Sequence, residues 1–377
     1  MSMIKVSSRK FKRISTLGLS AILLFMLVLS GCGSNKEAAS SSTNASSSTN
    51  AASSTNAAGA DDASTSEPVK IRLQLKWVPQ AQFAGYYVAL DKGYYKEEGL
   101  DVEILPGGPD IVPEQQVANG AAEIGNSWVA SLLSHQEQGF PIIEIAQISQ
   151  KSGMLLVSKK SAGINSPADL KGKKVGSWMG GLEFEILALF KKYNLEAPKD
   201  LELAKQGFTM DQFLNDQLDA ASALTHNEYP ILLEQGLKES DLNVIDMNEE
   251  GVAMLQDNLF ANTEWLENNK EAAAKFLRAS FKGWQDTINN PEEAVDIVMK
   301  SADKDSTTRE HQLNMAIAIG KLVLPEGADP SQIGQINKES FQQTADIAYE
   351  FGVIKNKVDL SKAYTDEIFK LATGTSQ

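Results

Sequence analysis

The sequence of 377 residues predicts an α/β protein built from two lobes. Short runs of β-forming residues alternate with segments of helical periodicity, the pattern of mostly parallel sheets covered by helices. Roughly 310 residues remain for folding once the N-terminal segments described below are set aside, which is more than one hydrophobic core usually supports. A second block of strands interrupts the first, so we expect the second lobe to be inserted into the first. The binding site would then lie in the cleft between them.

The first 31 residues have the features of a secretory signal peptide. Five basic residues precede the apolar stretch 14–29, which is shorter than the ~20 residues that span a bilayer. The stretch ends Leu29-Ser30-Gly31-Cys32, and Cys32 is the only cysteine of the chain. This ending resembles the lipobox of bacterial lipoproteins, which predicts lipid attachment at Cys32 and an extracytoplasmic protein anchored to the cell membrane. The alternatives are a transmembrane anchor and a buried free thiol.

Residues 32–67 predict a flexible linker, because they are Ser, Asn, Ala and Thr with almost no large apolar side chain. The formal net charge of −14 argues against a nucleic-acid partner. His135, His226 and His311 are too scattered to suggest a metal site, and we expect no cofactor. We expect His135 and His311 on helix surfaces and His226 near the ligand.

The first lobe is expected over residues 68–160 and 250–377. Residues 69–75 alternate between apolar and polar side chains up to Lys76, which predicts a strand with one buried face. Trp77-Val78-Pro79 ends it, since proline cannot donate to a strand ladder, and a helix with Phe83 on its packed face follows. The further strands expected in this lobe are 100–105, 121–125, 141–148 and 154–158.

The second lobe is expected over residues 161–249. Its strands are predicted at 175–178, 201–207, 220–224 and 242–247. The chain would then return to the first lobe through an apolar run at 252–256. From about residue 264 the pattern is helical, with helices expected at 265–288, 291–299, 309–322 and 341–351.

Several segments resemble one group of periplasmic substrate-binding proteins, the thiamine-pyrimidine-synthase-like (NMT-type) group. They are Trp77-x-Pro79 with Gly85–Asp101, Gly107–Ile111, Leu170–Gly176 and Asn227-Glu228. The resemblance implies a type II periplasmic-binding-protein fold, two αβα lobes with a cleft between them. It also implies a monomeric receptor of an ABC importer, with permease and ATPase subunits as partners. The implied ligand is a flat nitrogen heterocycle, either a thiamine pyrimidine precursor such as formylaminopyrimidine or, in another branch, riboflavin.

Two other functions remain open on the sequence. The same group contains a pyrimidine synthase, in which a histidine follows the Trp-x-Pro segment and a cysteine-rich run lies near the return crossing. This chain has Phe83 in the first place and no cysteine between residues 251 and 258, so we expect a receptor and not an enzyme. A sulfonate or nitrate receptor of the same architecture would need arginines in the pocket loops, and the loops singled out here contain none.

A planar heterocycle needs aromatic faces to stack on and polar groups for its ring atoms. Tryptophans stand at the ends of three predicted strands, and polar residues stand in the same loops. The alternative for each aromatic is core packing, and Glu183 also suits a helix N-terminus without any ligand. The candidate ligand-binding residues are Trp77, Gln80, Gln82, Phe83, Asn126, Trp128, Trp178, Glu183, Asn227, Glu228 and Tyr229.

Overall fold

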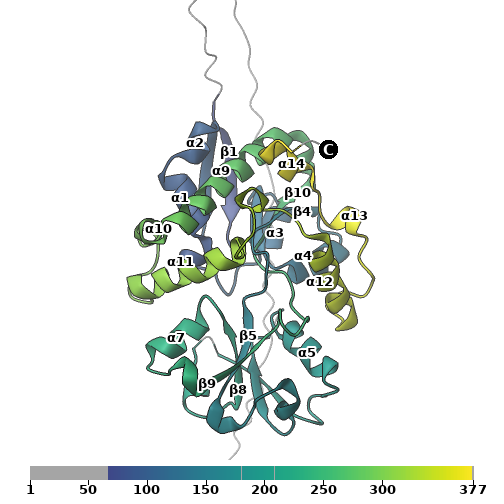
Figure 1. Ribbon diagram of the computed structural model, residues 1–377. Helices are drawn as coiled ribbons and strands as arrows, with labels where there is room; N and C mark the ends of the chain where they lie inside the picture. Colours follow the sequence, from purple (N-terminus) through teal and green to yellow (C-terminus); the bar gives the residue numbers. More distant parts are fainter. Residues whose placement is uncertain (1–66, 180, 208, 376–377) are drawn as a thin grey trace, which may run out of the picture. The chain divides into compact units, whose positions relative to one another are not determined.

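Two five-stranded sheets organise the computed structural model, which describes residues 67–179, 181–207 and 209–375. These residues fall within one compact unit, Ser64–Gln377. The first sheet has the order β2-β1-β3-β10-β4 and the second the order β7-β6-β8-β5-β9. Figure 1 shows β5, β8 and β9 with α5 and α7 in teal, apart from β1, β4 and β10. The predicted α/β fold of two lobes is confirmed.

The first sheet is built from β1 (Val69–Gln74), β2 (Leu100–Leu105), β3 (Ile124–Ser127), β4 (Ile142–Gln147) and β10 (Asn258–Asn262). The second is built from β5 (Met154–Lys159), β6 (Lys174–Ser177), β7 (Glu202–Lys205), β8 (Ala220–Leu224) and β9 (Leu242–Asp246). In each sheet three strands are parallel, β2-β1-β3 and β7-β6-β8. The carboxyl ends of parallel strands meet at one sheet edge, which is where α/β proteins place ligands.

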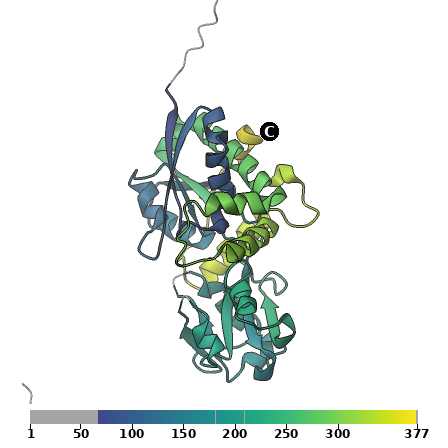
Figure 2. The same cartoon turned by 90° about the vertical axis from the view of Figure 1, so that its left-hand side faces the viewer.

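The helices of the first part of the chain are α1 (Ala84–Asp91), α2 (Tyr94–Glu97), α3 (Pro113–Ala118), α4 (Val129–Glu137), α5 (Glu183–Lys192), α6 (Asp211–Leu214) and α7 (Glu228–Glu234). The later ones are α8 (Thr263–Asn268), α9 (Lys270–Asn289), α10 (Pro291–Val298), α11 (Arg309–Val323), α12 (Lys338–Glu350), α13 (Leu360–Ala363) and α14 (Glu367–Thr373). In the turned view of Figure 2 the C-terminus lies with the first lobe, and α14 packs on α9. In the described part of the chain no helix is both long and apolar enough to cross a membrane.

The boundary between the lobes lies earlier than the sequence predicted. Strand β5 belongs to the second sheet, where it pairs antiparallel with β8 and β9, so the first crossing lies between β4 and β5 and not after residue 160. Continuous apolar strands of both sheets look alike in sequence, which explains the misplacement. The return crossing does run through residues 252–256, as predicted, and it leads into β10.

Close packing of α1 on α9 forms the centre of the first lobe. Gly85 and Gly283 let the two backbones meet, since a Cβ on Gly283 would overlap the carbonyl oxygen of Gly85. Trp284 is fully buried beside them and meets Tyr86 edge-on, at 5.6 Å between ring centroids. The helix predicted at 265–288 is two helices, α8 and α9, separated at Asn269. Rigid packing here holds the loop between β1 and α1, which carries several candidate residues.

Candidate functional site

A buried ion pair lies at the carboxyl end of β1. The Lys76 side chain is only 2% exposed, and its Nζ lies 2.9 Å from Oδ1 of Asp257, which immediately precedes β10. The same Nζ lies 4.3 Å from the centroid of the Trp128 ring, a cation–π distance. The alternation in β1 had placed Gln74 and Lys76 on the polar face, yet both are buried. Sequence reasoning therefore missed Lys76 and Asp257, although the position of Lys76 beside Trp77 was a usable signal.

Glutamines of the β1–α1 loop complete the surroundings of Asp257. Gln82 Nε2 lies 3.1 Å from both carboxylate oxygens of Asp257, and Gln80 Nε2 donates to Gln82 Oε1 at 2.8 Å. Asp257 has a left-handed backbone, with φ of 44°. Burial lowers the pKa of Lys76, while the charge of Asp257 acts in the opposite direction. Of the predicted polar residues, Gln82 thus binds the Asp257 carboxylate, and Gln80 binds Gln82.

His226 is the corresponding buried group of the second lobe. It follows β8, is 1% exposed, and neither of its ring nitrogens has a hydrogen-bond partner among the residues that the structure describes. Burial lowers its pKa to about 4, the charge of Asp257 opposes this, and those of Lys76 and His311 add to it. These electrostatic interactions place His226 within the field of the first-lobe ion pair. At neutral pH the imidazole is therefore uncharged, with one donor and one acceptor nitrogen.

The backbone beside His226 approaches closely, so that a Cβ on Gly153 would lie 3.2 Å from its Nδ1 and 3.1 Å from Oγ1 of Thr225. The Thr225 hydroxyl also lacks a hydrogen-bond partner within the described part of the chain. Buried polar groups in native proteins are normally paired, so such a concentration calls for an explanation. We call Lys76, Gln82, Trp128, His226 and Asp257 the buried polar cluster.

The predicted residues of β3 lie close to this cluster. Asn126 is buried, and its Nδ2 donates to the Asn258 carbonyl at 2.9 Å, while its Oδ1 has no partner among the described residues. Trp128 is half-buried, with Lys76 over its ring. Trp77 is half-buried and packs partly on the core of the first lobe. The structure thus brings Trp128, Gln80, Gln82 and Asn126 to one sheet edge.

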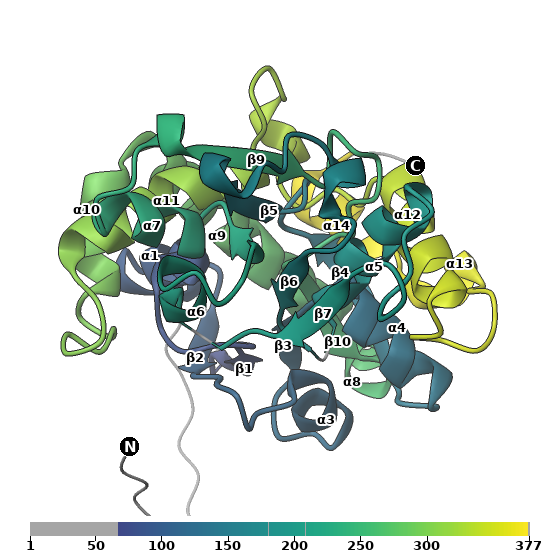
Figure 3. The ribbon, with the colours of Figure 1, turned by 90° about the horizontal axis from the view of Figure 1, so that it is seen from below.

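Phe83 takes a different position from the one expected. Its ring is 0% exposed and belongs to the hydrophobic core of the first lobe, which leaves no face for a ligand. His311 also differs, because it is buried and not on the helix surface. Its Nδ1 lies 3.1 Å from both carboxylate oxygens of Glu234, and its Nε2 lies 3.0 Å from Oδ1 of Asn227. These contacts join α11 of the first lobe to α7 of the second, which lie together in Figure 3.

Two candidates follow β6 in the second lobe. Trp178 is half-buried, packs against a core cluster, and donates its Nε1–H to the Gly207 carbonyl at 2.9 Å. Glu183 begins α5, and its Oε2 accepts from the Gly181 backbone N–H at 2.6 Å. This contact is the helix N-terminal interaction that Glu183 could make without a ligand.

Of the three candidates after β8, Asn227 and Glu228 have hydrogen-bond partners, and Tyr229 lines a groove. Glu228 is buried and accepts from the Leu224 N–H at 3.0 Å and from Asn227 Nδ2 at 2.7 Å. Burial raises its pKa to about 6, and these hydrogen bonds moderate the rise. Tyr229 is half-buried and lines a groove of about 780 Å³ between α7 and α11, to which Thr225 also contributes. That volume suits a small ligand, since such pockets measure roughly 300–1,000 Å³.

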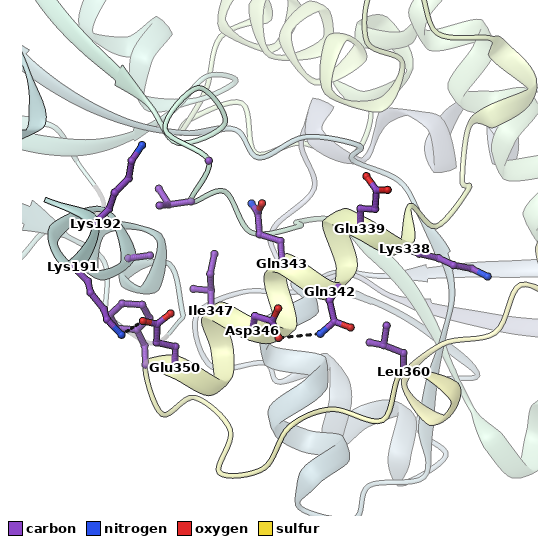
Figure 4. A pocket seen from close by; sticks show the side chains of 14 residues that line it. Lys191, Lys192, Lys338, Glu339, Gln342, Gln343, Asp346, Ile347, Glu350 and Leu360 are labelled. Carbon is purple, nitrogen blue, oxygen red and sulfur yellow. Dashed lines mark hydrogen bonds and ion pairs between the residues drawn. The ribbon is translucent and has the colours of Figure 1, made fainter.

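A second groove, of about 950 Å³, lies between α5 and α12, away from these strand ends (Figure 4). Lys191 and Glu350 form an ion pair across it, and Gln342 hydrogen-bonds to Asp346. Lys192 pairs with Glu250 and Gln343 donates to the Ala253 carbonyl, and Phe351 is the one aromatic residue in the lining. The described residues contain no group of His, Cys, Asp and Glu that could hold a metal ion.

The sequence of the chain is similar to those of several proteins with known names. The family model described as NMT1/THI5 like matches residues 80–294, more than half of the chain. The chain is 26% identical to a formylaminopyrimidine-binding protein of Halalkalibacterium halodurans, over 70% of this chain and 82% of that protein. It is also 26% identical to the riboflavin-binding protein RibY of Chloroflexus aurantiacus, over 79% and 85% of the two chains.

A yeast relative has an enzymatic name. The chain is 29% identical to the 4-amino-5-hydroxymethyl-2-methylpyrimidine phosphate synthase THI11 of Saccharomyces cerevisiae, over 60% of this chain and 69% of that protein. Among solved structures, the periplasmic aliphatic sulphonate binding protein SsuA of Escherichia coli superposes with a TM-score of 0.63 at 17% identity, covering 79% of this chain and 92% of that one. That likeness confirms the two-lobed fold of periplasmic binding proteins.

Proposed function

Because the chain belongs to the NMT1/THI5-like family, we propose that it is the extracytoplasmic substrate-binding protein of an ABC importer, and that it captures a flat nitrogen heterocycle. The binding proteins named for formylaminopyrimidine and riboflavin support the ligand class. Permease and ATPase subunits would be the partners. The protein would act as a monomer, held at the membrane by a lipid on Cys32, a residue outside the described part of the chain.

One observation carries the proposal. Buried polar groups that lack hydrogen-bond partners, His226 above all, lie at the strand ends of the second lobe within the field of the Lys76–Asp257 pair of the first. An unpaired buried polar group costs about 1–3 kcal/mol, and a ligand with matching ring atoms would remove that cost. Trp128 offers aromatic surface beside Lys76 of that pair, and the half-buried Trp77 follows Lys76 in the chain.

The same cluster disfavours an anionic ligand such as a sulfonate or nitrate. Lys76 is the buried cation at the strand ends, and Asp257 already neutralises it at 2.9 Å. An added anion would face the Asp257 carboxylate in a site of low polarity, which is costly. A pyrimidine synthase is the second alternative, because the yeast relative is named as one. Phe83 in place of a histidine and the absence of cysteine from residues 251–258 argue against it.

Equilibrium titration calorimetry with the purified full chain in detergent would test the proposal. Riboflavin, formylaminopyrimidine and hydroxymethylpyrimidine are the heterocycles to compare with an alkanesulfonate and nitrate. We expect saturable one-to-one binding of at least one heterocycle and of neither anion. Binding of an anion alone would move the protein to another ligand class, and pyrimidine formation on incubation with pyridoxal phosphate would make it an enzyme.

Membrane anchoring has a separate test. Radiolabelled palmitate should label the wild-type protein in cells, and Cys32→Ser should abolish the label and release the protein from the membrane fraction. Equal labelling of both proteins would refute lipidation at Cys32 without affecting the ligand proposal.

A further inference from the structure

Two neighbouring residues near the start of α11 hold loops of both lobes. Gln312 is buried, and its Oε1 accepts from the backbone N–H of Ala81 at 2.6 Å, in the loop between β1 and α1. His311 contacts Asn227 and Glu234 of the second lobe, so its ring lies between α11 and α7. Both loops carry candidate ligand-binding residues. This end of α11 is therefore placed to set how the two loops face each other.

Both ring nitrogens of His311 face groups that only accept hydrogen bonds. Nδ1 lies 3.1 Å from each carboxylate oxygen of Glu234, and Nε2 lies 3.0 Å from Oδ1 of Asn227. A neutral imidazole has one donor nitrogen, so it could satisfy only one of these contacts and would press an acceptor against an acceptor in the other. The imidazolium has two donors and satisfies both.

The orientation of the Asn227 amide is fixed by a separate contact. Its Nδ2 donates to Glu228 Oε1 at 2.7 Å, and Glu228 is buried. Turning the amide over would place its oxygen against the Glu228 carboxylate, two acceptors at hydrogen-bond distance. Burial raises the pKa of Glu228 only to about 6, so this carboxylate is mostly ionised at neutral pH. The amide oxygen is therefore held toward His311, and the ring must supply the donor.

We propose that His311 is an imidazolium that joins the two lobes as a proton-dependent latch, and that it positions the loop of Asn227 and Glu228 against the first lobe. The latch itself involves only groups of this chain. Its consequence for ligand rests on the proposed function. In that receptor the latch favours contact between the lobes, so the heterocycle should bind more weakly as the pH rises.

The charges around the ring favour its protonated form. Glu234 and Glu228 come from α7, and Glu310 stands beside His311 in α11. Arg309, two residues earlier, is paired with acidic residues of α10. From the loop after β8, His226 is the basic neighbour, and burial lowers its pKa to about 4, so it is uncharged at neutral pH. A positive ring here meets more negative than positive charge, and loss of its proton at high pH should release the contact.

Imidazole NMR tests the charge. The chain has only three histidines, so isotope-labelled histidine in the purified full chain, in detergent, gives three rings to assign by substitution. At pH 7 we expect both nitrogens of His311 to have the shifts of protonated nitrogens, and His226 to have one of each kind. Glu234→Gln should leave His311 with one proton, because an amide N–H can donate to Nδ1 of an uncharged ring. The matched control Glu310→Gln, which removes a neighbouring carboxylate, should keep the imidazolium.

Distances between the lobes test the latch. Spin labels would be attached through Lys160→Cys in the second lobe and Lys304→Cys in the first, both at exposed positions, in the full chain carrying Cys32→Ser. Pulsed electron paramagnetic resonance then gives the distribution of distances between the labels. We expect this distribution to broaden or shift between pH 6 and 9, because the latch loses its proton over that range.

The same variants assign that change to His311. Burial raises the pKa of Glu144 and of Glu185 to about 8, so these groups titrate over the same range in every variant. Glu310→Gln should keep the full change in distance, whereas Glu234→Gln should at least halve it, because its amide can pair with the uncharged ring at either pH.

The outcomes keep the two proposals apart. The inference would be overturned by a His311 ring with a single protonated nitrogen at pH 7. A distance distribution that does not change with pH, or that changes equally in the parent protein and in Glu234→Gln, would also overturn it. Neither measurement involves a ligand, so absence of heterocycle binding would refute the proposed function alone.

Discussion

Replacing Lys76 with methionine should destabilise the folded protein by about 3 kcal/mol, because it leaves a buried carboxylate without its cation. The side chains of Lys76 and Asp257 are 2% and 5% exposed, so water cannot take the place of the lost ammonium. Breaking a buried ion pair from one side typically costs about 3–5 kcal/mol. Gln82 would still donate to Asp257 at 3.1 Å, which places the expected value at the lower end of that range.

A double-mutant cycle distinguishes this loss from a simple packing defect. Asp257→Asn removes the negative charge and suits the left-handed backbone at this position, where asparagine is well tolerated. Combined with Lys76→Met it should recover at least about 1 kcal/mol, because the two side chains are in direct contact. Urea unfolding followed by circular dichroism gives the free energy of unfolding of each variant. A control is Lys199→Met, whose exposed ion pair with Glu196 should contribute less than about 1 kcal/mol.

Two results would refute the reasoning about the pair. One is a Lys76→Met variant within about 0.5 kcal/mol of the wild type, the range of ordinary surface substitutions. The other is additivity in the cycle, which would mean that Lys76 and Asp257 do not interact in solution.

Three further perturbations test the packing of α1 on α9, the buried carboxyl group of Glu185 in α5, and a predicted ligand contact. Gly283→Ala should lower the free energy of unfolding by about 1–3 kcal/mol through overlap with α1, whereas Gly320→Ala in α11, with 3.4 Å of clearance, should leave it unchanged or raise it by up to about 1 kcal/mol in urea titrations. Burial raises the pKa of Glu185 to about 8, so between about pH 6 and 8 the folded state holds a proton that the unfolded state releases. The free energy of unfolding should therefore fall by up to about 1.4 kcal/mol per pH unit as the pH rises through this range. Glu185→Gln should reduce that slope in calorimetric scans across the same range. Trp178→Ala should weaken heterocycle binding about tenfold, or about 1.4 kcal/mol, with Trp178→Phe as the control that keeps an aromatic face, and an unchanged dissociation constant would assign the ring to packing.

Local patterns in the sequence were enough to predict the elements and the fold class. The strands at 100–105 and 220–224 and the helix beginning at residue 309 have the predicted limits to within one residue. Periodicity reports burial along a single element, so it is reliable for such segments. The partner of a strand is a different matter, because it depends on distant residues. The apolar run of β5 therefore gave no indication that it pairs with β8 and β9 in the second sheet.

The structure shows where the predicted site residues lie, and their contact with a ligand stays a prediction. Gln80, Gln82, Asn126 and Trp128 were chosen because they stand in strand-end loops, and they lie at one sheet edge because such an edge gathers these loops. Lys76 was missed because a lysine in an alternating strand normally faces water, and only Asp257, far away in sequence, explains its burial. Phe83 was misjudged for the opposite reason, since an aromatic near a loop carries no mark of how deeply its helix is packed.

The position of Asp257 connects the buried polar cluster with the crossings between the lobes. Its carbonyl oxygen accepts from the backbone N–H of Ile148 at 3.0 Å and from that of Ser149 at 3.3 Å, so it fastens the return crossing to the outward one. Its carboxylate holds Lys76 from the end of β1. A ligand that draws on Lys76 would therefore act on the residue at which both crossings meet. Hinge motion in two-lobed proteins is concentrated in a few residues of the crossings, so we predict that Asp257 would link ligand contact to lobe closure in the proposed receptor.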